Sequence, residues 1–227
     1  MKSKLIIVEG TDCSGKQTQT EKIVERLNKM GIKAIRMQAP FYDSGTGKII
    51  AGAYLNKEGY GMSSVFPEGA NNVDNKVASL LYATDRLYNK PRIEKYLADG
   101  YVVVMDRYVE SNLAFQGGRI KDKKERHEFY KFLLNLEYDL LKLPKPDLKL
   151  LLFMPLNVST KLKKNRKEKP DEYEKDESLL QNAENAYLEL VDFCGFEKIE
   201  CSDGENPKSI EEIHECVFEK VKNFLEI

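Results

Sequence analysis

The sequence predicts an α/β fold that begins with a phosphate-binding loop, and three observations support this prediction. A short apolar run, Leu5-Ile6-Ile7-Val8, leads through a glycine-containing loop into an amphipathic segment that ends at Gly31. Strand-like apolar runs then alternate with helix-like segments along the whole chain. No linker rich in Pro, Gly or Ser divides the 227 residues, so we expect a single domain over residues 1–227.

The first loop has the chemistry of a phosphate site. Two glycines and a lysine would meet a helix N-terminus, where backbone N–H groups, the helix dipole and the lysine all favour polyphosphate. A bare G-x4-G-K string occurs by chance in roughly one chain of this length in fifteen, but its place between a first strand and a first helix makes the match specific. We therefore expect the loop to bind ATP through Gly10, Thr11, Asp12, Cys13, Ser14, Gly15, Lys16, Gln17 and Thr18. Gln17 stands where the pattern has a Ser or Thr that ligates Mg2+.

The other elements follow from periodicity. Strands are expected at 33–37, 101–105, 148–153 and 197–201, with a short helix at 48–55 and a polar loop at 56–72. A helix at 73–97 would carry Val77, Leu80, Leu81 and Tyr88 on one side and kink or break at Pro91. A helix at 124–143 would carry Phe129, Leu133, Leu136, Leu140 and Leu143 on one face, and a helix at 209–225 would turn Ile210, Ile213, Val217, Val221 and Leu225 inward.

Composition narrows the class of protein. Thirty-six basic and 37 acidic residues give a net charge of −1, so no global field favours nucleic acid or membrane. The apolar runs are too short to span a bilayer, and the N-terminus reads as a strand instead of a signal peptide, which predicts a cytoplasmic protein. The four cysteines show no C-x-x-C spacing, so we expect reduced thiols and no zinc site.

Candidate ligand contacts gather after the strands, where open α/β sheets bind ligands. Tyr42 lies in the loop after the second strand, and Asp106 and Arg107 follow the third. The two charged residues suit either a metal and phosphate site or a structural ion pair, and the preceding phosphate loop favours the site. Tyr82 and Arg86 stand one helical turn apart, which suits stacking on a base and binding its edge, although spacing alone favours an ordinary cation–π or surface pair.

A charged segment follows the fourth strand. Six basic residues crowd 161–169 and five acidic residues crowd 171–177. Such a run is usually a solvated helix face, but here it would also serve as a lid that carries cations onto phosphates.

Nearly end to end, the chain resembles the thymidylate kinases, P-loop nucleoside monophosphate kinases that phosphorylate dTMP. The loop Gly10-Thr11-Asp12-Cys13-Ser14-Gly15-Lys16 is similar to the family's phosphate loop, and Leu80-Leu81-Tyr82-Ala83-Thr84-Asp85-Arg86 resembles its thymine helix. Asp106-Arg107-Tyr108, followed by Ser111-Asn112 and Ala114-Phe115-Gln116, is similar to its most specific motif. Pro146-Asp147 precedes the fourth strand as in the family, and Tyr173-Glu174 with Asp176 resembles the segment after its lid.

The resemblance implies a P-loop NTPase fold, with a five-stranded parallel sheet flanked by helices on both faces, a lid at about 157–177 and a homodimer. It implies transfer of the ATP γ-phosphoryl group to dTMP with Mg2+, and no nucleic-acid or membrane partner. The implied catalytic residues are Lys16, Asp106, Arg107 and Arg166, and the implied metal residues are Asp12, Asp106 and Glu174. The implied dTMP contacts are Asp12, Tyr42, Tyr82, Arg86, Arg107, Asn112, Phe115, Gln116 and Tyr173.

The chain departs from the family pattern at several places. Many members carry a phosphate-binding arginine after the second strand, where this chain has Gln38 and Phe41; the Tyr42 hydroxyl is the candidate replacement. Phe115 replaces the commoner tyrosine. The phosphate loop carries no arginine in its variable positions, so the chain resembles members with a catalytic arginine in the lid, for which Arg166 is the candidate.

Two other functions remain open from the sequence. A related deoxynucleoside kinase would phosphorylate a sugar hydroxyl and would need a carboxylate base there. A non-catalytic nucleotide-binding protein is the second alternative, although the chain has no N-K-x-D guanine motif.

Overall fold

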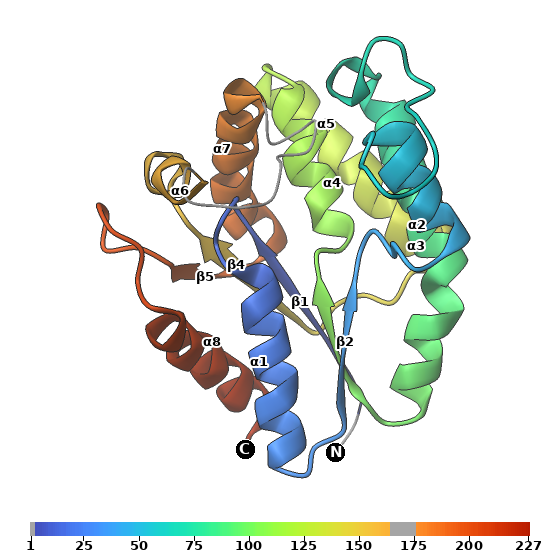
Figure 1. Ribbon diagram of the computed structural model, residues 1–227. Coiled ribbons are helices and arrows are strands. Elements are labelled where there is room, and N and C mark those ends of the chain that lie inside the picture. The colour runs from blue at the N-terminus through green and yellow to red at the C-terminus, as the bar shows by residue number, and fades with distance from the viewer. Residues whose placement is uncertain (1–2, 164–175) are drawn as a thin grey trace.

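A five-stranded parallel sheet forms the centre of the molecule. The computed structural model describes residues 3–163 and 176–227 (Figure 1). The strands lie in the order β2-β3-β1-β4-β5, and every neighbouring pair is parallel. Their bounds are β1 Lys4–Gly10, β2 Ala34–Gln38, β3 Val102–Asp106, β4 Leu148–Phe153 and β5 Glu197–Glu200. The predicted fold class is confirmed.

Helices connect successive strands and cover both faces of the sheet. Their bounds are α1 Lys16–Lys29, α2 Gly45–Ile49, α3 Asn75–Ala98, α4 Val109–Phe115, α5 Lys123–Leu134, α6 Leu156–Lys163, α7 Glu177–Cys194 and α8 Ile210–Leu225. Two π-helical segments, η1 (Ile50–Tyr54) and η4 (Asn135–Leu140), continue α2 and α5. Two short 3-10 turns, η2 (Ala70–Asn72) and η3 (Gly117–Arg119), lie in the loops. No helix of the described residues is long and apolar enough to cross a membrane.

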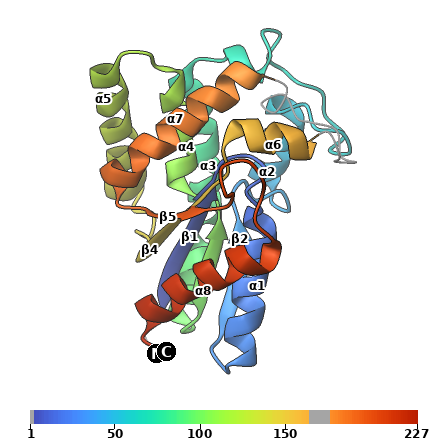
Figure 2. The ribbon, with the colours of Figure 1, turned by 90° about the vertical axis from the view of Figure 1, so that its left-hand side faces the viewer.

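Alternating side chains of the central strand β1 build two separate cores. Leu5 and Ile7 point into a cluster with residues of α3, α4, α5 and α7, whereas Ile6 and Val8 point into a cluster with residues of α1 and α8. Figure 2 shows α1 and α8 on one side of the sheet and α4, α5 and α7 on the other. Because both faces are covered, β1 is buried at every position after Lys4 and is continuously apolar from Leu5 to Val8, as expected for a central parallel strand.

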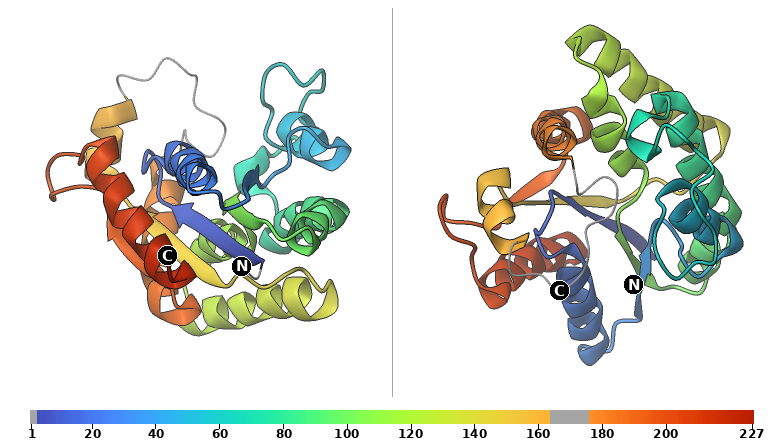
Figure 3. Two further views of the ribbon diagram at one scale, coloured as in Figure 1. Left: turned by 90° about the horizontal axis from the view of Figure 1, so that it is seen from below. Right: turned by 45° about the horizontal axis from the view of Figure 1, so that its top comes forward.

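The chain reverses its direction of winding at β1, which pairs with β3 on one edge and β4 on the other. In an open α/β sheet, the carboxyl end of the strands at such a switch point is the usual ligand site. The view onto this end shows α2 and α3 on one side of the loop after β1, and α6 and α7 on the other (Figure 3, right). The fold therefore places a site between these helix pairs.

The third helix differs from its prediction in two ways. Helix α3 continues through Pro91 without a break, because residue 87, whose carbonyl loses a hydrogen-bond donor, lies on the exposed side of the helix. Val77, Leu80 and Tyr88, predicted as one apolar side, are 44%, 48% and 64% exposed. The buried side of α3 instead carries polar and charged residues that belong to the site described below.

The segment after α5 also turns differently from its prediction. The π-helical turn η4 adds a residue to the turn and rotates the following side chains around the axis. Glu137 and Tyr138 become buried, and Leu140 becomes 66% exposed. The prediction that Leu140 shares one face with the buried Phe129 and Leu133 is therefore wrong. The predicted inward position of Ile210 in α8 is also wrong, because Ile210 is 50% exposed.

Candidate active site

The loop between β1 and α1 is held in place by the neighbouring strand. The Thr11 hydroxyl donates to the backbone oxygen of Met154 at 2.7 Å and accepts from the Met154 N–H at 2.8 Å, and the Thr11 N–H donates to Leu152 O. A Cβ on Gly10 would lie 2.5 Å from the Leu152 oxygen, so only glycine allows this approach. Gly15, directly before helix α1, has φ +80°, a left-handed backbone conformation that suits glycine. The loop geometry is therefore set by its own glycines and by contacts with residues at the end of β4.

Lys16 folds back over the loop that it follows. Its ammonium group donates to the backbone oxygens of Gly10, at 3.1 Å, and Thr11, at 2.9 Å. Burial, and then the nearby Arg107 charge, lower the pKa of Lys16 to about 8, although Asp106 and Asp12 act in the opposite direction. A phosphate arriving at the helix N-terminus would compensate both effects and draw the ammonium away from the loop oxygens.

Arg107 is the second cation at this end of the sheet. Its backbone has φ +64°, a left-handed conformation that a non-glycine residue adopts only where its surroundings hold it. The guanidinium donates to the Tyr187 hydroxyl at 3.3 Å and lies 5.0 Å from the Phe115 ring centroid. Burial lowers the pKa of Arg107, but Tyr187, Glu9 and other nearby groups outweigh this effect and raise it, so the group stays charged.

Glu9 is a fully buried carboxylate beneath Arg107. Its two oxygens accept from the Tyr108 N–H, the Ser111 hydroxyl and the Tyr187 hydroxyl, at 2.7 to 2.9 Å. Burial raises the pKa of Glu9, although Arg107 and these hydrogen bonds act against the rise. Because Glu9 ties together the residues that surround Arg107, it is a positioning residue for that cation.

Two carboxylates lie beside these cations. Asp106 accepts from the Arg36 guanidinium at 2.6 Å, and Asp12 accepts from the Cys13 N–H at 3.0 Å. Both carboxylates raise the pKa of Lys16 and of Arg107, and both line the cavity described below. No group of three or more His, Cys, Asp or Glu side chains suited to a metal occurs within residues 3–163 and 176–227.

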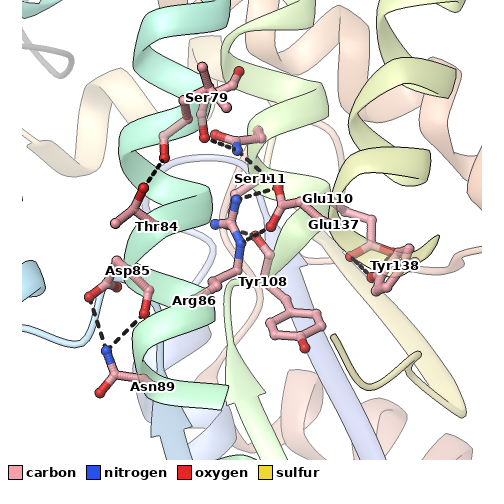
Figure 4. Close-up of polar contacts among 12 residues, drawn as sticks. Ser79, Thr84, Asp85, Arg86, Asn89, Tyr108, Glu110, Ser111, Glu137 and Tyr138 are labelled. Carbon is pink, nitrogen blue, oxygen red and sulfur yellow. Dashed lines mark hydrogen bonds and ion pairs between the residues drawn. The ribbon is translucent and has the colours of Figure 1, made fainter. Parts of the chain in front are cut away.

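Arg86 is buried in a bidentate ion pair at the other end of the site. Its Nη2 donates to one Glu137 oxygen at 2.6 Å and its Nε donates to the other. Figure 4 shows the Arg86 and Glu137 side chains side by side. Glu137 also accepts from the Asn112 amide at 3.2 Å. Burial lowers the pKa of Arg86, but Glu137 outweighs burial and raises it. Spacing alone favoured a cation–π or surface pair of Tyr82 and Arg86. In the structure Arg86 is instead buried and forms an ion pair with Glu137 of η4.

Aromatic and loop residues complete this end. The Tyr82 ring meets the buried Tyr54 ring edge to face, with centroids 5.8 Å apart. Asp85, from the same turn of α3, accepts from the Phe41 N–H at 2.9 Å and the Thr46 hydroxyl at 2.7 Å. Asp85 therefore anchors the loop after β2 to α3.

One cavity of about 470 Å³ joins the two ends. Four loop residues of the predicted ATP site, Gly10, Thr11, Ser14 and Thr18, do not line it. The predicted site residues that line it are Asp12, Cys13, Gly15, Lys16, Gln17, Tyr42, Tyr82, Arg86, Asp106, Arg107, Asn112, Phe115 and Gln116. Arg166, Tyr173 and Glu174, together with most of the predicted lid, lie outside the described residues.

Sequence reasoning missed Glu9, Lys57, Asp85 and Glu137 as site residues. Each gains its place from a contact with a distant segment, and none stands in a spacing pattern that would single it out. A charged residue inside an otherwise apolar strand, as at Glu9, was the one signal available.

The parallel sheet and the glycine- and lysine-containing loop between β1 and α1, which borders the cavity, are the features of a P-loop enzyme. The family model described as thymidylate kinase matches residues 8–217 of the chain. The chain belongs to the thymidylate kinase family, and the predicted enzyme class is confirmed.

Individual relatives agree with this membership. A probable thymidylate kinase from Pyrococcus horikoshii is 30% identical over 99% of this chain and 98% of its own length. The thymidylate kinase from Mycobacterium tuberculosis is 30% identical over 82% of this chain and 85% of its own. The structure of thymidylate kinase from Candida albicans, at 22% identity, superimposes with a TM-score of 0.72 over 98% of this chain and 92% of its own, which supports the fold.

Proposed function

We propose that the cavity holds ATP at the phosphate loop and dTMP between Tyr82 and Arg107, so that the γ-phosphoryl group of ATP passes directly to the dTMP phosphate. The activity itself, dTMP kinase, follows from membership of the family. The observation that supports this use of the site is the continuous cavity, which is lined by the phosphate loop at one end and by Tyr82, Arg86 and Asn112 at the other.

The protein's part in this reaction is positioning and charge neutralisation. Lys16 would bind the donor phosphates, and Arg107 would bind the acceptor phosphate from its held backbone position. A phosphate monoester is already ionised near neutral pH, so no strong general base is needed. Tyr82 would stack on the thymine ring, while Arg86 and Asn112, fixed by Glu137, would bind the edge of the base.

Mg2+ fits the acidic side of the cavity. It typically binds through one or two carboxylates together with substrate phosphates and water, and Asp12 and Asp106 line the cavity beside Lys16. Glu174 would join them, as the family resemblance implies. The ion would neutralise charge on the donor phosphates. The Gln17 amide donates to Glu21 at 3.0 Å, so we assign no metal contact to Gln17.

The lid and its arginine remain predictions from the sequence. We propose that residues 157–177 act as the lid of a single domain over 1–227 and that Arg166 carries the catalytic cation. Arg166→Ala should lower kcat tenfold or more with little change in nucleotide binding, because arginine fingers contribute about 10³–10⁵ in rate. Lys163, Lys164 and Lys167, each replaced by Ala, are the controls, and equal behaviour of all four variants would contradict the role of Arg166.

The outward face of α3 supports a homodimer. Leu80, Leu87 and Tyr88 are between 41% and 64% exposed, and Phe132 and Leu140 add exposed apolar area from α5 and η4. These segments lie together, since the ammonium of Lys76 on α3 lies over the Phe132 ring. An apolar surface of this kind marks an interaction site, and the family resemblance names a second copy as its occupant.

Light scattering tests the dimer. Leu80→Asp should convert a dimer to a monomer, whereas Ile210→Asp, which alters an equally exposed apolar residue on α8, should leave the dimer intact. A wild-type protein that is monomeric at micromolar concentration would contradict the proposal. A cytoplasmic location, without nucleic-acid or membrane partners, remains a prediction that cell fractionation tests.

A substrate panel tests the reaction. With ATP and Mg2+, the purified protein should phosphorylate dTMP and leave thymidine and deoxyguanosine unchanged. Rapid phosphorylation of thymidine would instead identify a deoxynucleoside kinase. Comparison of dTMP with dUMP then measures the preference among pyrimidine monophosphates.

A further inference from the structure

Arg36 is a charged residue of β2 that has been mentioned so far only as a partner of Asp106. Strand β2 lies at the edge of the sheet, and its Ala34 packs in the apolar core between the sheet and helices α1 and α8. Side chains two positions apart in a strand point to the same face, so Arg36 and Gln38 continue this face toward the carboxyl end of the sheet. The face that α1 covers therefore changes from apolar to polar as it approaches the cavity.

The pairing of β2 with β3 brings Arg36 beside Asp106. Arg36 is paired in register with Val104, and Gln38 with Asp106. The Arg36 Nη2 group donates to Asp106 Oδ2 at 2.6 Å, and the two side chains are only 20% and 12% exposed. The protein therefore screens this ion pair from solvent better than a pair on the open surface.

The Arg36 guanidinium also holds two further partners. Its Nε donates to the Thr20 hydroxyl of α1 at 2.8 Å, and its Nη1 donates to Gln38 Oε1 at 3.2 Å. The Thr20 hydroxyl in turn lies 2.9 Å and 2.8 Å from the backbone oxygens of Lys16 and Gln17, to which it donates. A planar guanidinium donates in fixed directions, so these contacts set its orientation. The carboxylate at the end of β3 is thereby linked to the first turn of the helix that follows the phosphate loop.

This arrangement keeps one oxygen of Asp106 for the cavity. Arg36 occupies Oδ2, whereas Oδ1 accepts no hydrogen bond from any group of residues 3–163 and 176–227. Asp106 lines the cavity together with Lys16, and Arg36 does not line it. The terminal torsion of an Asp side chain is soft, so a carboxylate without support would rotate. Arg36 removes this freedom.

We propose that Arg36 is a positioning residue for phosphoryl transfer, which fixes the Asp106 carboxylate relative to the phosphate loop and keeps one of its oxygens available to the ion that the proposed function places there. This inference rests on the proposed function. Phosphoryl transfer depends on alignment and on charge neutralisation, and a misplacement of about 1 Å can cost about 10² in rate. Because Arg36 lies outside the cavity lining, it acts through Asp106.

Steady-state kinetics of Arg36→Met test this role, because the substitution keeps much of the side-chain length and removes every donor. kcat should fall by about tenfold or more, whereas the KM values for ATP and dTMP should change less than about threefold. Arg36→Lys keeps the charge without the planar fork, so it should recover only part of the lost rate. Arg26→Met is the matched control, since Arg26 of α1 pairs with Glu215 away from the cavity, and its kcat should match wild type. A wild-type kcat in Arg36→Met would overturn the proposal.

A double-mutant cycle shows whether Arg36 acts through Asp106. Asp106→Asn should lower kcat by itself, and the addition of Arg36→Met should then lower it further by less than about twofold. If the loss in the double variant equals the product of the two single losses, Arg36 has an independent structural role and the proposal is wrong.

A crystal structure of Arg36→Met gives a measurement that does not depend on turnover. The Asp106 carboxylate should be rotated or present in two orientations while the backbone of β3 keeps its position, and an unchanged carboxylate would overturn the proposal. If thermal unfolding shows that Arg36→Met does not fold, Thr20→Val decides the role, because it removes the support from α1 and keeps the ion pair. A loss in kcat of about twofold or more then supports the proposal, and wild-type kcat overturns it. Failure of the proposed function has a different result, because the wild-type protein itself would then not phosphorylate dTMP.

Discussion

The two ends of the cavity are built in different ways. The phosphate-loop end is one continuous segment from β1 into α1, and its shape is set by glycines and by contacts to the adjacent strand β4. The opposite end combines side chains from α3, α4, η4 and the loop after η1, which are far apart in the sequence. A contiguous site keeps its spacing in the sequence, whereas a dispersed site exists only when packing has brought its segments together.

The electrostatics of the two ends differ as well. At the phosphate loop, Lys16 lies among backbone oxygens with a lowered pKa and gains most when a phosphate binds. At the base end, Arg86 is already neutralised by a buried carboxylate. The phosphate-loop end is therefore suited to bind a negatively charged ligand. At the base end, the ion pair fixes the position of hydrogen-bonding groups that a neutral ligand can meet. Four experiments examine this difference.

The largest effect is expected from breaking the buried pair of Arg86 and Glu137. Glu137→Ala should lower the free energy of unfolding by about 3–5 kcal/mol, because it leaves an uncompensated buried charge. Urea denaturation measures this loss. Glu128→Ala, at an exposed carboxylate on α5, is the control and should leave the urea midpoint near that of wild type.

The double variant with Met at 86 and 137 sharpens the result. Its loss of stability should be smaller than the sum of the two single losses, because removal of both charges leaves neither unpaired. Strictly additive losses would show that the two side chains do not act as a pair.

Replacement of Lys16 should change the free energy of unfolding less than Glu137→Ala does, and its main effect should be on activity. Lys16→Ala should reduce kcat by about 10²–10³, the scale of losing one preorganised donor in a closed site, while the unfolding midpoint stays near that of wild type. Steady-state kinetics with dTMP and ATP provide the measurement, with Lys29→Ala at the exposed end of α1 as control. Activity within tenfold of wild type would contradict the assignment of the phosphate loop.

Tyr82→Ala tests the base end through binding alone. Loss of stacking should weaken dTMP binding by about 1–3 kcal/mol, and ATP binding should change little. Thr84→Ala, an exposed position on the same helix, should leave both affinities unchanged. If dTMP and ATP weaken equally, Tyr82 is a packing residue of α3.

The smallest effect is a proton uptake at the phosphate loop. In the free protein Lys16 loses its proton above its pKa of about 8, whereas bound phosphates favour the charged form. ATP binding should therefore take up a fraction of a proton near pH ~9 and almost none from this group near pH ~7. Calorimetry in buffers of different ionisation enthalpy measures the uptake. Lys16→Ala should abolish it, and an uptake that persists in this variant would assign the proton to another group.

The same shift has a defined effect on the stability of the free protein. The folded pKa of Lys16 is lowered from 10.5 to about 8, so between these values the unfolded chain binds more protons than the folded one. The contribution of Lys16 to the free energy of unfolding therefore rises with pH across that window, while the affinity for ATP falls.

Prediction succeeded where residues near in sequence are also near in space. The loop from Gly10 to Thr18, the five strands and the family motifs were all recognised from local pattern. The pair at Tyr82 and Arg86 was placed on one face of α3, but its partner Glu137 was not foreseen, because a π-helical turn shifts the register after α5. The same turn explains why Leu140 does not share the buried face of Phe129 and Leu133.

The face of α3 was misjudged for a related reason. Apolar spacing placed Val77, Leu80 and Tyr88 on one side of the helix, but that side is exposed, and the helix turns Asp85, Arg86 and Asn89 to the interior. Periodicity identifies the sides of a helix and does not tell which side meets the core of the same chain. Where a polar side completes a binding site, the apolar side remains exposed.

The sequence by itself determined the parallel sheet, the phosphate loop and the family. These depend on local backbone preferences and on the alternation of apolar residues, both of which act over a few neighbouring positions. Only the tertiary structure decided that Glu9 supports Arg107, that Glu137 fixes Arg86, and that Lys57 faces the cavity on Tyr42. Each of these contacts joins segments whose separation is set by packing, and a buried charge becomes interpretable only when its partner is known.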